Sequence, residues 1–392
     1  MITTSEILAL KNLGEGISKD IIEWRRALHK TPELKMDVPQ TEALIVKILT
    51  QIGVDSIQSG VGGHGVCALI KGDLPGKCLA IRADCDGLPI KEETGLEFAS
   101  TNGNMHACGH DSHTAMALGA AKLLVQNRHL LKGSVKLIFQ PYEEGDGGAK
   151  LMLADNVLDG VDAIIGLHNN CACDDDYIAG DVLATPNPIS ANIYAYDATF
   201  SGTTSHVCYA NTAINAVHAA CNAVTQISDM DVPPHTINAI TVVSGGVRNN
   251  VIPQECTISG SIRSFDGEVF KSVRQRVADV LQSVAAKTGT TLEVSTSIDL
   301  MATENDKDMY DNFYSVVGKL YPERGCVALK NLDLIGEDFA RFSSVVPGLY
   351  FMLHTRPEGQ CYPLHHPKFD VNESVLHKGS TVFAGFALMW QN

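Results

Sequence analysis

One cysteine and three histidines of this chain fall within nine residues, and two adjacent glutamates follow about thirty residues later. Thiolate, imidazole and carboxylate groups are the side chains that bind zinc, manganese, cobalt or nickel in proteins. A doubled glutamate also allows one carboxylate to bind metal while its neighbour moves protons. This combination predicts a hydrolase that uses metal ions. The residues are His106, Cys108, His110, His113, Glu143 and Glu144.

Further acids and histidines lie where buried strands should end. Asp84 and Asp86 follow an apolar run at residues 78–82, and His168 follows a second run at residues 163–167. The glutamate pair follows a third such run. Catalytic metals in open α/β sheets lie beyond the carboxyl ends of the strands. Four separate features with ligand chemistry therefore favour a metal site, although an isolated Cys-X-His pair would be weak evidence.

Other polar residues have ordinary explanations when only their spacing is considered. The pair His365 and His366 precedes a proline, as solvated loop histidines often do. His206 follows a run of small polar residues, and Asn250 lies in a turn-like segment. Arg263 ends an expected strand, where an exposed salt bridge is the default role. Spacing alone therefore assigns none of these residues to the site.

The first part of the chain alternates between the patterns of buried strands and amphipathic helices. Short apolar runs bounded by glycine or polar residues indicate strands, and apolar residues at helical spacing indicate helices. Such alternation predicts an α/β domain with a mixed, largely parallel sheet covered by helices. The expected strands are residues 66–70, 78–82, 135–139, 163–167 and 349–353, and the expected helices are residues 20–29, 41–52, 112–126 and 383–390.

The middle of the chain follows a different order, β-α-β-β-α-β, which is typical of a ferredoxin-like α+β module. The pattern resumes α/β character afterwards, so the module should be an insertion. We expect a catalytic domain built from residues 1–188 and 302–392, with an inserted domain at residues 189–301. The expected strands of the insertion are 193–200, 237–243, 256–262 and 292–297, and its expected helices are 212–227 and 269–288.

Composition excludes several classes of partner. The formal net charge of −15 disfavours nucleic acid and anionic membranes, because both require a basic surface. No run approaches the roughly 18 apolar residues of a membrane span, and no signal peptide is visible. We therefore expect a cytoplasmic protein whose eleven cysteines are mostly reduced. For Cys171 and Cys173 this predicts unpaired loop thiols, with oxidation or an extra metal site as the alternatives.

Eight ordered motifs together resemble one family nearly end to end. The chain is similar to the amidohydrolase branch of the co-catalytic metallopeptidase and aminoacylase superfamily, which includes hippurate hydrolases, N-acyl amino acid amidohydrolases and auxin-conjugate hydrolases. The resemblance implies a cofactor of two divalent ions (Mn, Zn, Ni or Co) and an N-acetyl, N-benzoyl or similar N-acyl amino acid as substrate. It also implies a homodimer formed through the inserted domain. The motifs are residues 25–34, 82–90, 106–111, 139–145, 166–168, 250–254, 336–339 and 364–365.

The resemblance implies a ligand set for the two metal ions. Cys108 would bridge both ions as a thiolate, where other branches of the superfamily use an aspartate. His110, Glu144, His168 and His365 would complete the two coordination shells. This replaces the surface role that spacing alone assigns to His365.

The resemblance also implies the roles of five other residues. Glu143 would be the general base that takes a proton from the attacking water and delivers it to the leaving amine. Asp84 would orient the site. His206 would reach the partner subunit's site and stabilise the oxyanion. Asn250 and Arg263 would bind the substrate, Arg263 through its α-carboxylate.

Three other functions remain open. A carboxypeptidase or dipeptidase of the same superfamily would differ only in its substrate. A cysteine hydrolase would use Cys108 as a nucleophile, and a non-catalytic protein would bind a small molecule without turnover. The loop before His206 also departs from the family, since it has Thr203 and Thr204 in place of a glycine-rich run.

Overall fold

The chain divides into two compact units in a computed structural model that describes residues 2–145, 147–173, 176–330 and 332–391. The first unit comprises Met1–Ile189, Glu304–Asn331 and Asp338–Asn392, and the second comprises Ser190–Thr303 and Leu332–Glu337. The domain boundaries predicted from the sequence assigned Leu332–Glu337 to the catalytic domain instead. The segment belongs to the second unit because the Ala191 backbone N–H donates to the Ile335 carbonyl at 2.8 Å.

The first unit contains a mixed sheet with the strand order β1-β2-β4-β3-β5-β14-β6-β13. Its centre is parallel, because β3 pairs in parallel with β4 and β5, and β14 pairs in parallel with β5. This agrees with the mixed, largely parallel sheet predicted from the sequence. The strands are β1 (Ser56–Val61), β2 (Gly65–Lys71), β3 (Leu74–Asp84), β4 (Lys132–Gln140), β5 (Ala163–Asn170), β6 (Val182–Ala184), β13 (Cys326–Ala328) and β14 (Gly348–His354).

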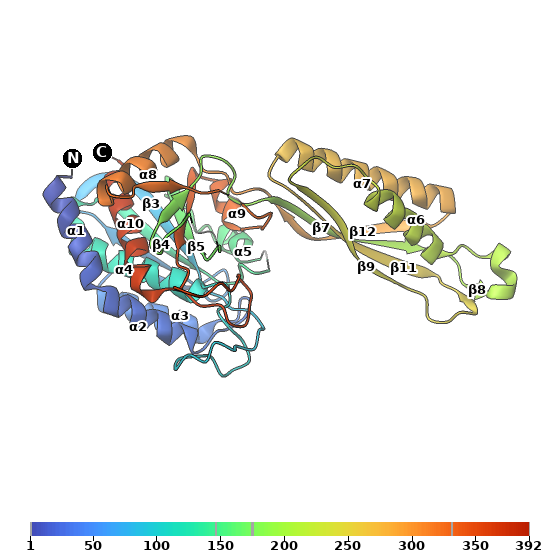
Figure 1. Ribbon diagram of the computed structural model, residues 1–392, viewed down its shortest axis with the longest axis horizontal. Helices are drawn as coiled ribbons and strands as arrows, with labels where there is room; N and C mark the ends of the chain where they lie inside the picture. The colour runs from blue at the N-terminus through green and yellow to red at the C-terminus, as the bar shows by residue number, and fades with distance from the viewer. Residues whose placement is uncertain (1, 146, 174–175, 331, 392) are drawn as a thin grey trace. The chain divides into compact units, whose positions relative to one another are not determined.

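Helices cover both faces of this sheet (Figure 1). Helices α4 and α10 pack on each other and are flanked by α1, α2 and α8, whereas the short α5 and α9 contact β4, β5 and β14. Leu79 and Ile81 of β3 lie in the apolar core beneath α4. The helices are α1 (Thr4–Gly16), α2 (Ser18–His29), α3 (Pro39–Ile52), α4 (His110–Gln126), η1 (Arg128–Leu130), α5 (Gly148–Ala154), α8 (Lys307–Leu320), α9 (Phe339–Ser343), η3 (Glu373–Val375) and α10 (Leu376–Met389).

Helix α10 begins seven residues before the predicted start at residue 383. Its first turns contain Gly379 and Ser380, which do not read as an apolar stripe. The small residues are required there because a Cβ at Gly379 would lie 2.2 Å from the Met116 sulfur of α4. Because close packing on α4 requires small residues here, this part of the helix lacks the apolar pattern from which a helix is predicted.

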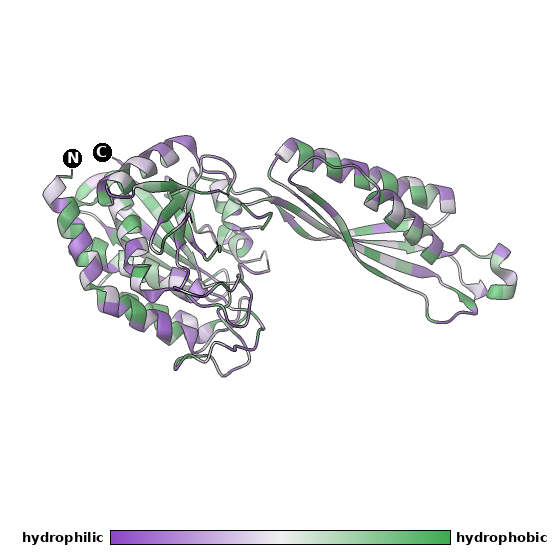
Figure 2. Cartoon of the chain, in the orientation of Figure 1, coloured by the Kyte–Doolittle hydropathy of each residue, from purple (hydrophilic) through white to green (hydrophobic). Residues whose placement is uncertain are grey.

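The second unit has the predicted β-α-β-β-α-β order and an antiparallel sheet ordered β12-β7-β11-β9. Both helices pack against the sheet through the buried residues of a separate apolar core, and α7 alternates between apolar and polar faces (Figure 2). A two-stranded ribbon joins β8 to β10. The elements are β7 (Asn192–Ser201), β8 (Ser205–His206), η2 (Val207–Thr212), α6 (Ala216–Ser228), β9 (Thr236–Gly245), β10 (Val251–Ile252), β11 (Glu255–Ser264), α7 (Gly267–Thr288) and β12 (Thr291–Leu300).

The helix predicted at residues 212–227 was wrong at its start. Thr212 ends the 3-10 helix η2, and α6 begins only at Ala216. The Asn215 side chain caps α6 by accepting from the His218 backbone N–H at 3.2 Å. An N-cap residue has non-helical backbone angles, so the helix cannot extend back through it.

Among the described residues, no helix has the length and apolar character needed to cross a membrane.

Candidate metal centre

The five predicted ligands all belong to the first unit and come from four segments of the chain. Cys108 lies in the loop before α4, and His110 is the first residue of that helix. Glu144 follows β4, His168 lies on β5, and His365 lies in the segment between β14 and α10. Because β4 and β5 flank β3 in the parallel centre of the sheet, their carboxyl ends carry side chains to one edge.

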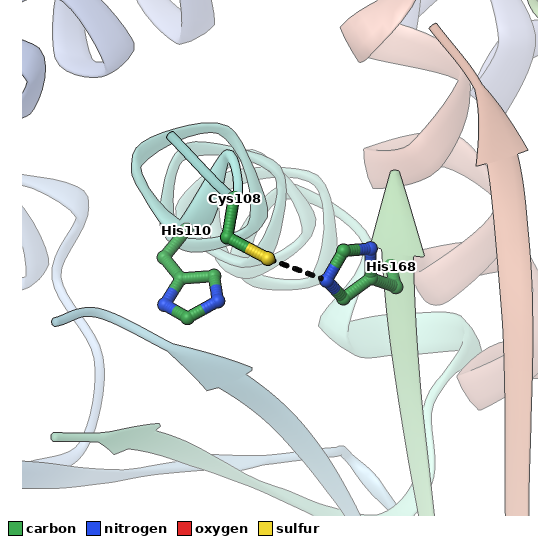
Figure 3. A group of neighbouring side chains, drawn as sticks. All are labelled: Cys108, His110 and His168. Carbon is green, nitrogen blue, oxygen red and sulfur yellow. Dashed lines mark hydrogen bonds between the residues drawn. The ribbon is translucent and has the colours of Figure 1, made fainter. Parts of the chain in front are cut away.

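Cys108 is shared by two groups of candidate ligands. The first group is Cys108, His110 and His168, and the second is Cys108, Glu144 and His365; within each group the ligand atoms lie within 4.8 Å of one another. The Cys108 thiol donates to Nε2 of His168 at 3.3 Å (Figure 3). Nε2 of His365 lies 3.2 Å from a Glu144 carboxylate oxygen. A sulfur common to two ligand groups has the placement that a bridging thiolate requires.

The donor set fits divalent ions such as zinc. Sulfur, imidazole nitrogen and carboxylate oxygen are its usual ligands. Nε2 of His110 is buried and has no hydrogen-bond partner among the described residues. Burial lowers the pKa of His168, which favours the neutral imidazole that binds metal. Burial also raises the pKa of the Cys108 thiol, so a bound cation would be needed to hold it as thiolate.

Backbone carbonyls fix the orientation of two ligand imidazoles. Nδ1 of His110 donates to the Asp86 carbonyl at 2.9 Å, and Nδ1 of His168 donates to the Asn169 carbonyl at 2.8 Å. Each hydrogen bond places the proton on Nδ1 and leaves the lone pair on Nε2. Nε2 is therefore the nitrogen of each ring that is available to a metal ion, as is common for histidines held by a second partner.

Asp86 ties the glutamate pair to this centre, a role that the sequence analysis missed. Its carboxylate accepts from the backbone N–H of Glu143 at 3.0 Å and of Glu144 at 3.4 Å. Asp84, the last residue of β3, pairs in parallel with Gln140, the last residue of β4. Asp86 lies two residues beyond Asp84 and is therefore beside the turn that follows β4. In the sequence, this role of Asp86 was indicated only by its position just beyond β3, two residues after Asp84. The Glu143 carboxylate lies 4.0 Å from Nε2 of His110.

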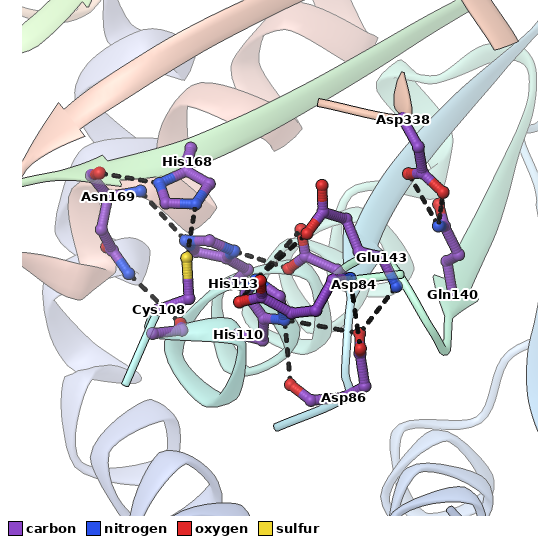
Figure 4. A network of polar contacts seen from close by, with 12 residues as sticks. Asp84, Asp86, Cys108, His110, His113, Gln140, Glu143, His168, Asn169 and Asp338 are labelled. Carbon is purple, nitrogen blue, oxygen red and sulfur yellow. Dashed lines mark hydrogen bonds and ion pairs between the residues drawn. The ribbon is translucent and has the colours of Figure 1, made fainter. Parts of the chain in front are cut away.

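Asp84 lies next to the candidate ligands in a buried network of polar contacts (Figure 4). Its two oxygens accept from Nδ1 of His113 at 2.6 Å and from the Arg82 guanidinium at 2.8 Å. Burial alone would raise the pKa of Asp84, but His110, His113 and Arg82 together hold it well below its usual range. Nε2 of His113 accepts from the Asn169 backbone N–H at 3.0 Å. Both nitrogens of His113 are therefore used in support of the ligands.

A second buried network anchors the start of α4. Asp111 accepts from Nε of Arg25 at 2.8 Å and from Nδ1 of His29 at 2.7 Å, and Nε2 of His29 lies 3.2 Å from Glu92. Burial opposes a charge on His29, but Asp111 and Glu92 outweigh it and raise the pKa of His29 to about 9. The network fixes the residue after His110. In the sequence, Arg25 and His29 were marked only by the motif at residues 25–34, and Asp111 only by the motif at residues 106–111.

His206 and Asn250 lie together in the second unit. His206 pairs with Val251 across the β8–β10 ribbon, and the Val207 backbone N–H donates to the Asn250 carbonyl at 3.0 Å. Both residues are exposed. Nδ1 of His206 accepts from the Cys208 backbone N–H at 3.2 Å, so its ring proton is carried on Nε2.

Arg263 lies at the other end of the same unit's sheet, on β11. It is half-buried and donates to the Leu334 carbonyl at 2.8 Å. The exposed salt bridge expected from its position was wrong, because no ion pair of Arg263 occurs among the described residues. Arg263 instead holds the segment Leu332–Glu337.

The prediction of an unpaired thiol was wrong for Cys173. Cys173 forms a disulfide with Cys361, and their Cα atoms are 5.8 Å apart. The two residues are separated by 188 positions in sequence, so no local pattern could pair them. Cys171 stays free and buried, with its sulfur 3.4 Å from the Thr355 hydroxyl.

The chain matches the model of Peptidase family M20/M25/M40 over residues 80–389. It is 36% identical to "Thermostable carboxypeptidase 1" of Saccharolobus solfataricus, with 98% of both chains covered. It is 34% identical to "N-acetyl-L-cysteine deacetylase" of Bacillus subtilis, over 96% of this chain and 91% of that protein. A Bacillus subtilis crystal structure described as a dinuclear metal binding peptidase from the M20 family superposes with a TM-score of 0.82 at 32% identity, covering 95% of this chain and 98% of the other.

Proposed function

We propose that this chain, which belongs to Peptidase family M20/M25/M40, is an amidohydrolase that cleaves N-acyl amino acids with two divalent metal ions. Family membership makes it a hydrolase of a metal-dependent family. The substrate class, the number of ions and the role of each residue are the proposal. The N-acetylcysteine deacetylase relative, similar over nearly the whole chain, supports an N-acyl amino acid as substrate.

The sharing of Cys108 between two ligand groups is the observation that carries this function. One group would hold one ion through His110 and His168, and the other would hold the second through Glu144 and His365. When bound, two such ions lower the pKa of a water molecule and polarise the amide carbonyl. A cysteine nucleophile is disfavoured, because burial raises the pKa of the Cys108 thiol and because His168, the imidazole in hydrogen-bond contact with it, would serve as a metal ligand.

Glu143 moves the proton in the proposed reaction. Its backbone is held by Asp86, and its carboxylate lies beside the ligand imidazole of His110 without belonging to either group that contains Cys108. It would accept a proton from the attacking water and then deliver it to the nitrogen of the leaving amine. Asp84 would keep His113 and the ligand edge fixed during this transfer.

The second unit would supply groups that bind the substrate. Because Nδ1 of His206 accepts a hydrogen bond, its Nε2 carries the proton and can donate to an oxyanion. In a homodimer formed through this unit, the partner subunit's His206 would make that contact. Arg263 contacts Ser261 and a carbonyl rather than a carboxylate, so its positive charge suits the α-carboxylate of a substrate. Asn250 would bind beside His206.

A carboxypeptidase or dipeptidase activity is the second candidate, favoured by the carboxypeptidase relative at 36% identity. Both activities cleave an amide bond to an amino acid, so they differ only in the acyl side. The protein should be loaded with zinc or manganese and tested on N-acetyl, N-benzoyl and indole-acyl amino acids beside unblocked and blocked dipeptides. Release of free amino acid from the simple acyl compounds is expected. Exclusive cleavage of peptides would establish the second candidate instead.

A further inference from the structure

The Cys173–Cys361 disulfide joins the two segments that carry the ligands His168 and His365. Strands β5 and β14 are parallel neighbours, and their last residues, Asn170 and His354, lie opposite each other. Cys173 follows the end of β5 by three residues. Cys361 lies four residues before His365. Their Cα separation of 5.8 Å falls within the range that a disulfide spans.

The side chain of His365 is more exposed than those of the other candidate ligands, so fewer of its neighbours hold it in place. Half of its side chain is exposed, whereas His110 and Cys108 are buried. Its φ of 65° lies in the left-handed region, which a non-glycine residue keeps only when neighbouring contacts hold it. On one side its backbone N–H donates to the Ala107 carbonyl at 2.8 Å. On the other side the chain leads back to Cys361, so the disulfide ties that side.

The base of this segment is held without the disulfide. The Thr355 backbone N–H donates to the Asn170 carbonyl at 2.8 Å, and Nδ1 of His354 lies 2.8 Å from the Asn170 side-chain oxygen. These contacts fix the start of the segment, ten residues before His365. The disulfide adds a covalent tie much nearer to the ligand. Breaking it would remove this covalent tie while leaving the strands in place, with the Arg356 guanidinium still donating to the Ala172 carbonyl at 3.4 Å.

We propose that Cys173 and Cys361 form a reversible disulfide, and that its reduction lowers the affinity of the metal site to which His365 contributes. The proposal rests on the function proposed above, because it requires His365 to be a ligand. Both cysteines are exposed and can react with a small thiol of the glutathione class. One thiolate attacks a disulfide sulfur and forms a mixed disulfide, and a second thiol releases it. Two small thiols are oxidised to their disulfide, and two electrons and two protons pass to Cys173 and Cys361.

The test measures zinc affinity in both redox states by competition with a chromophoric chelator. A trialkylphosphine serves as the reductant, because thiol reductants themselves bind zinc, and mass spectrometry after alkylation counts the free thiols. The oxidised wild-type protein should bind two zinc ions per chain. The reduced protein should bind the weaker ion at least about tenfold less tightly, as expected when support of a ligand is lost. The Cys361→Ser variant should bind zinc with the affinity of the reduced protein, and addition of the phosphine should not change that affinity.

Cys221→Ser is the matched control, since Cys221 is an exposed free cysteine of the second unit; it should keep the wild-type response. Cys173→Ser provides a second variant if Cys361→Ser fails to fold, and the wild-type redox comparison needs no variant. Equal zinc affinity in both states would overturn the redox control and leave the proposed function intact, as would a response that persists in Cys361→Ser. Failure to bind zinc in either state would overturn the proposed function and this inference with it.

Discussion

The side chains around Cys108 and the ribbon that carries His206 occupy opposite environments. Around Cys108 the candidate ligands His110 and His168 are buried, and each has a second partner that fixes its tautomer. His206 is exposed and held by one ribbon pair and one hydrogen bond. A buried centre is thus fixed before substrate arrives, whereas an exposed donor is free to adjust. Substitutions of the candidate metal ligands in the first region should lower metal content and turnover together, and those in the second region should affect turnover alone.

Glu143 should give the largest loss of turnover without loss of metal, because its carboxylate lies 4.0 Å from Nε2 of His110 but is not itself a proposed metal ligand. The Glu143→Gln variant should bind two metal ions per chain while kcat falls by about 10²–10⁴-fold, the range for loss of a general base. Elemental analysis and steady-state kinetics on the same sample check both outcomes. Glu144→Gln is the matched control, and it should lose metal. Full activity in Glu143→Gln would contradict the mechanism.

His206 should give the next largest loss. His206→Ala removes an oxyanion donor, so kcat should fall by about 10²–10³-fold, or roughly 3–4 kcal/mol. Metal content and melting temperature should not change. His218→Ala, a change at another exposed histidine of the same unit, should leave kcat unaltered. Loss of metal from His206→Ala would contradict the expectation that substitutions in the second region affect turnover alone.

The stability of the first unit should depend on pH through His29. Burial opposes its charge, yet Asp111 and Glu92 raise its pKa from 6.5 to about 9. Below about pH 6.5 both folded and unfolded states hold the proton, so the full stabilisation is present. It declines as pH rises and is lost above about 9, a change of order 3 kcal/mol. Denaturant unfolding between pH 6.5 and 9.5 should show this fall, and His29→Gln should flatten it. An unchanged slope in that variant would assign the effect to other groups.

Asp86 should give the smallest of these effects. The Asp86→Asn variant keeps one oxygen acceptor and loses the other, so one of the backbone N–H groups of Glu143 and Glu144 is released. We expect metal affinity or kcat to fall by about 10–100-fold, as for other groups that support ligands. Because Asp86 positions the glutamates without touching substrate, kcat should fall while KM stays constant. A rise in KM at constant kcat would contradict the positioning role.

The central strands of the sheet and helix α4 could be predicted from the sequence, and they lead directly to the candidate ligands. Helices α1 and α8 also bury apolar faces but were not predicted. Cys108 and His110 were predictable because ligand types cluster next to a strong helix. His365 was not, since its spacing suited a surface loop, and only the family resemblance marked it. The pattern of the inserted domain predicted its topology, although the capping Asn215 moved one helix start.

Contacts between distant segments could not be predicted. Asp86 bonds to backbone groups 57 and 58 residues away, and Cys361 bonds to a cysteine 188 residues away. Neither contact leaves a periodic signal, because each is formed only when strands meet in space. For the same reason Arg263 appeared to be a surface cation, whereas it holds a segment some seventy residues later.

The most direct test of the bridging role of Cys108 is anomalous diffraction from crystals of the zinc-loaded protein. Two anomalous peaks should appear, about 3.5–4 Å apart, each about 2.3 Å from the Cys108 sulfur. One should lie beside His110 and His168, and the other beside Glu144 and His365. A single peak, or two peaks that do not share the Cys108 sulfur, would contradict the dinuclear centre on which the proposed function depends.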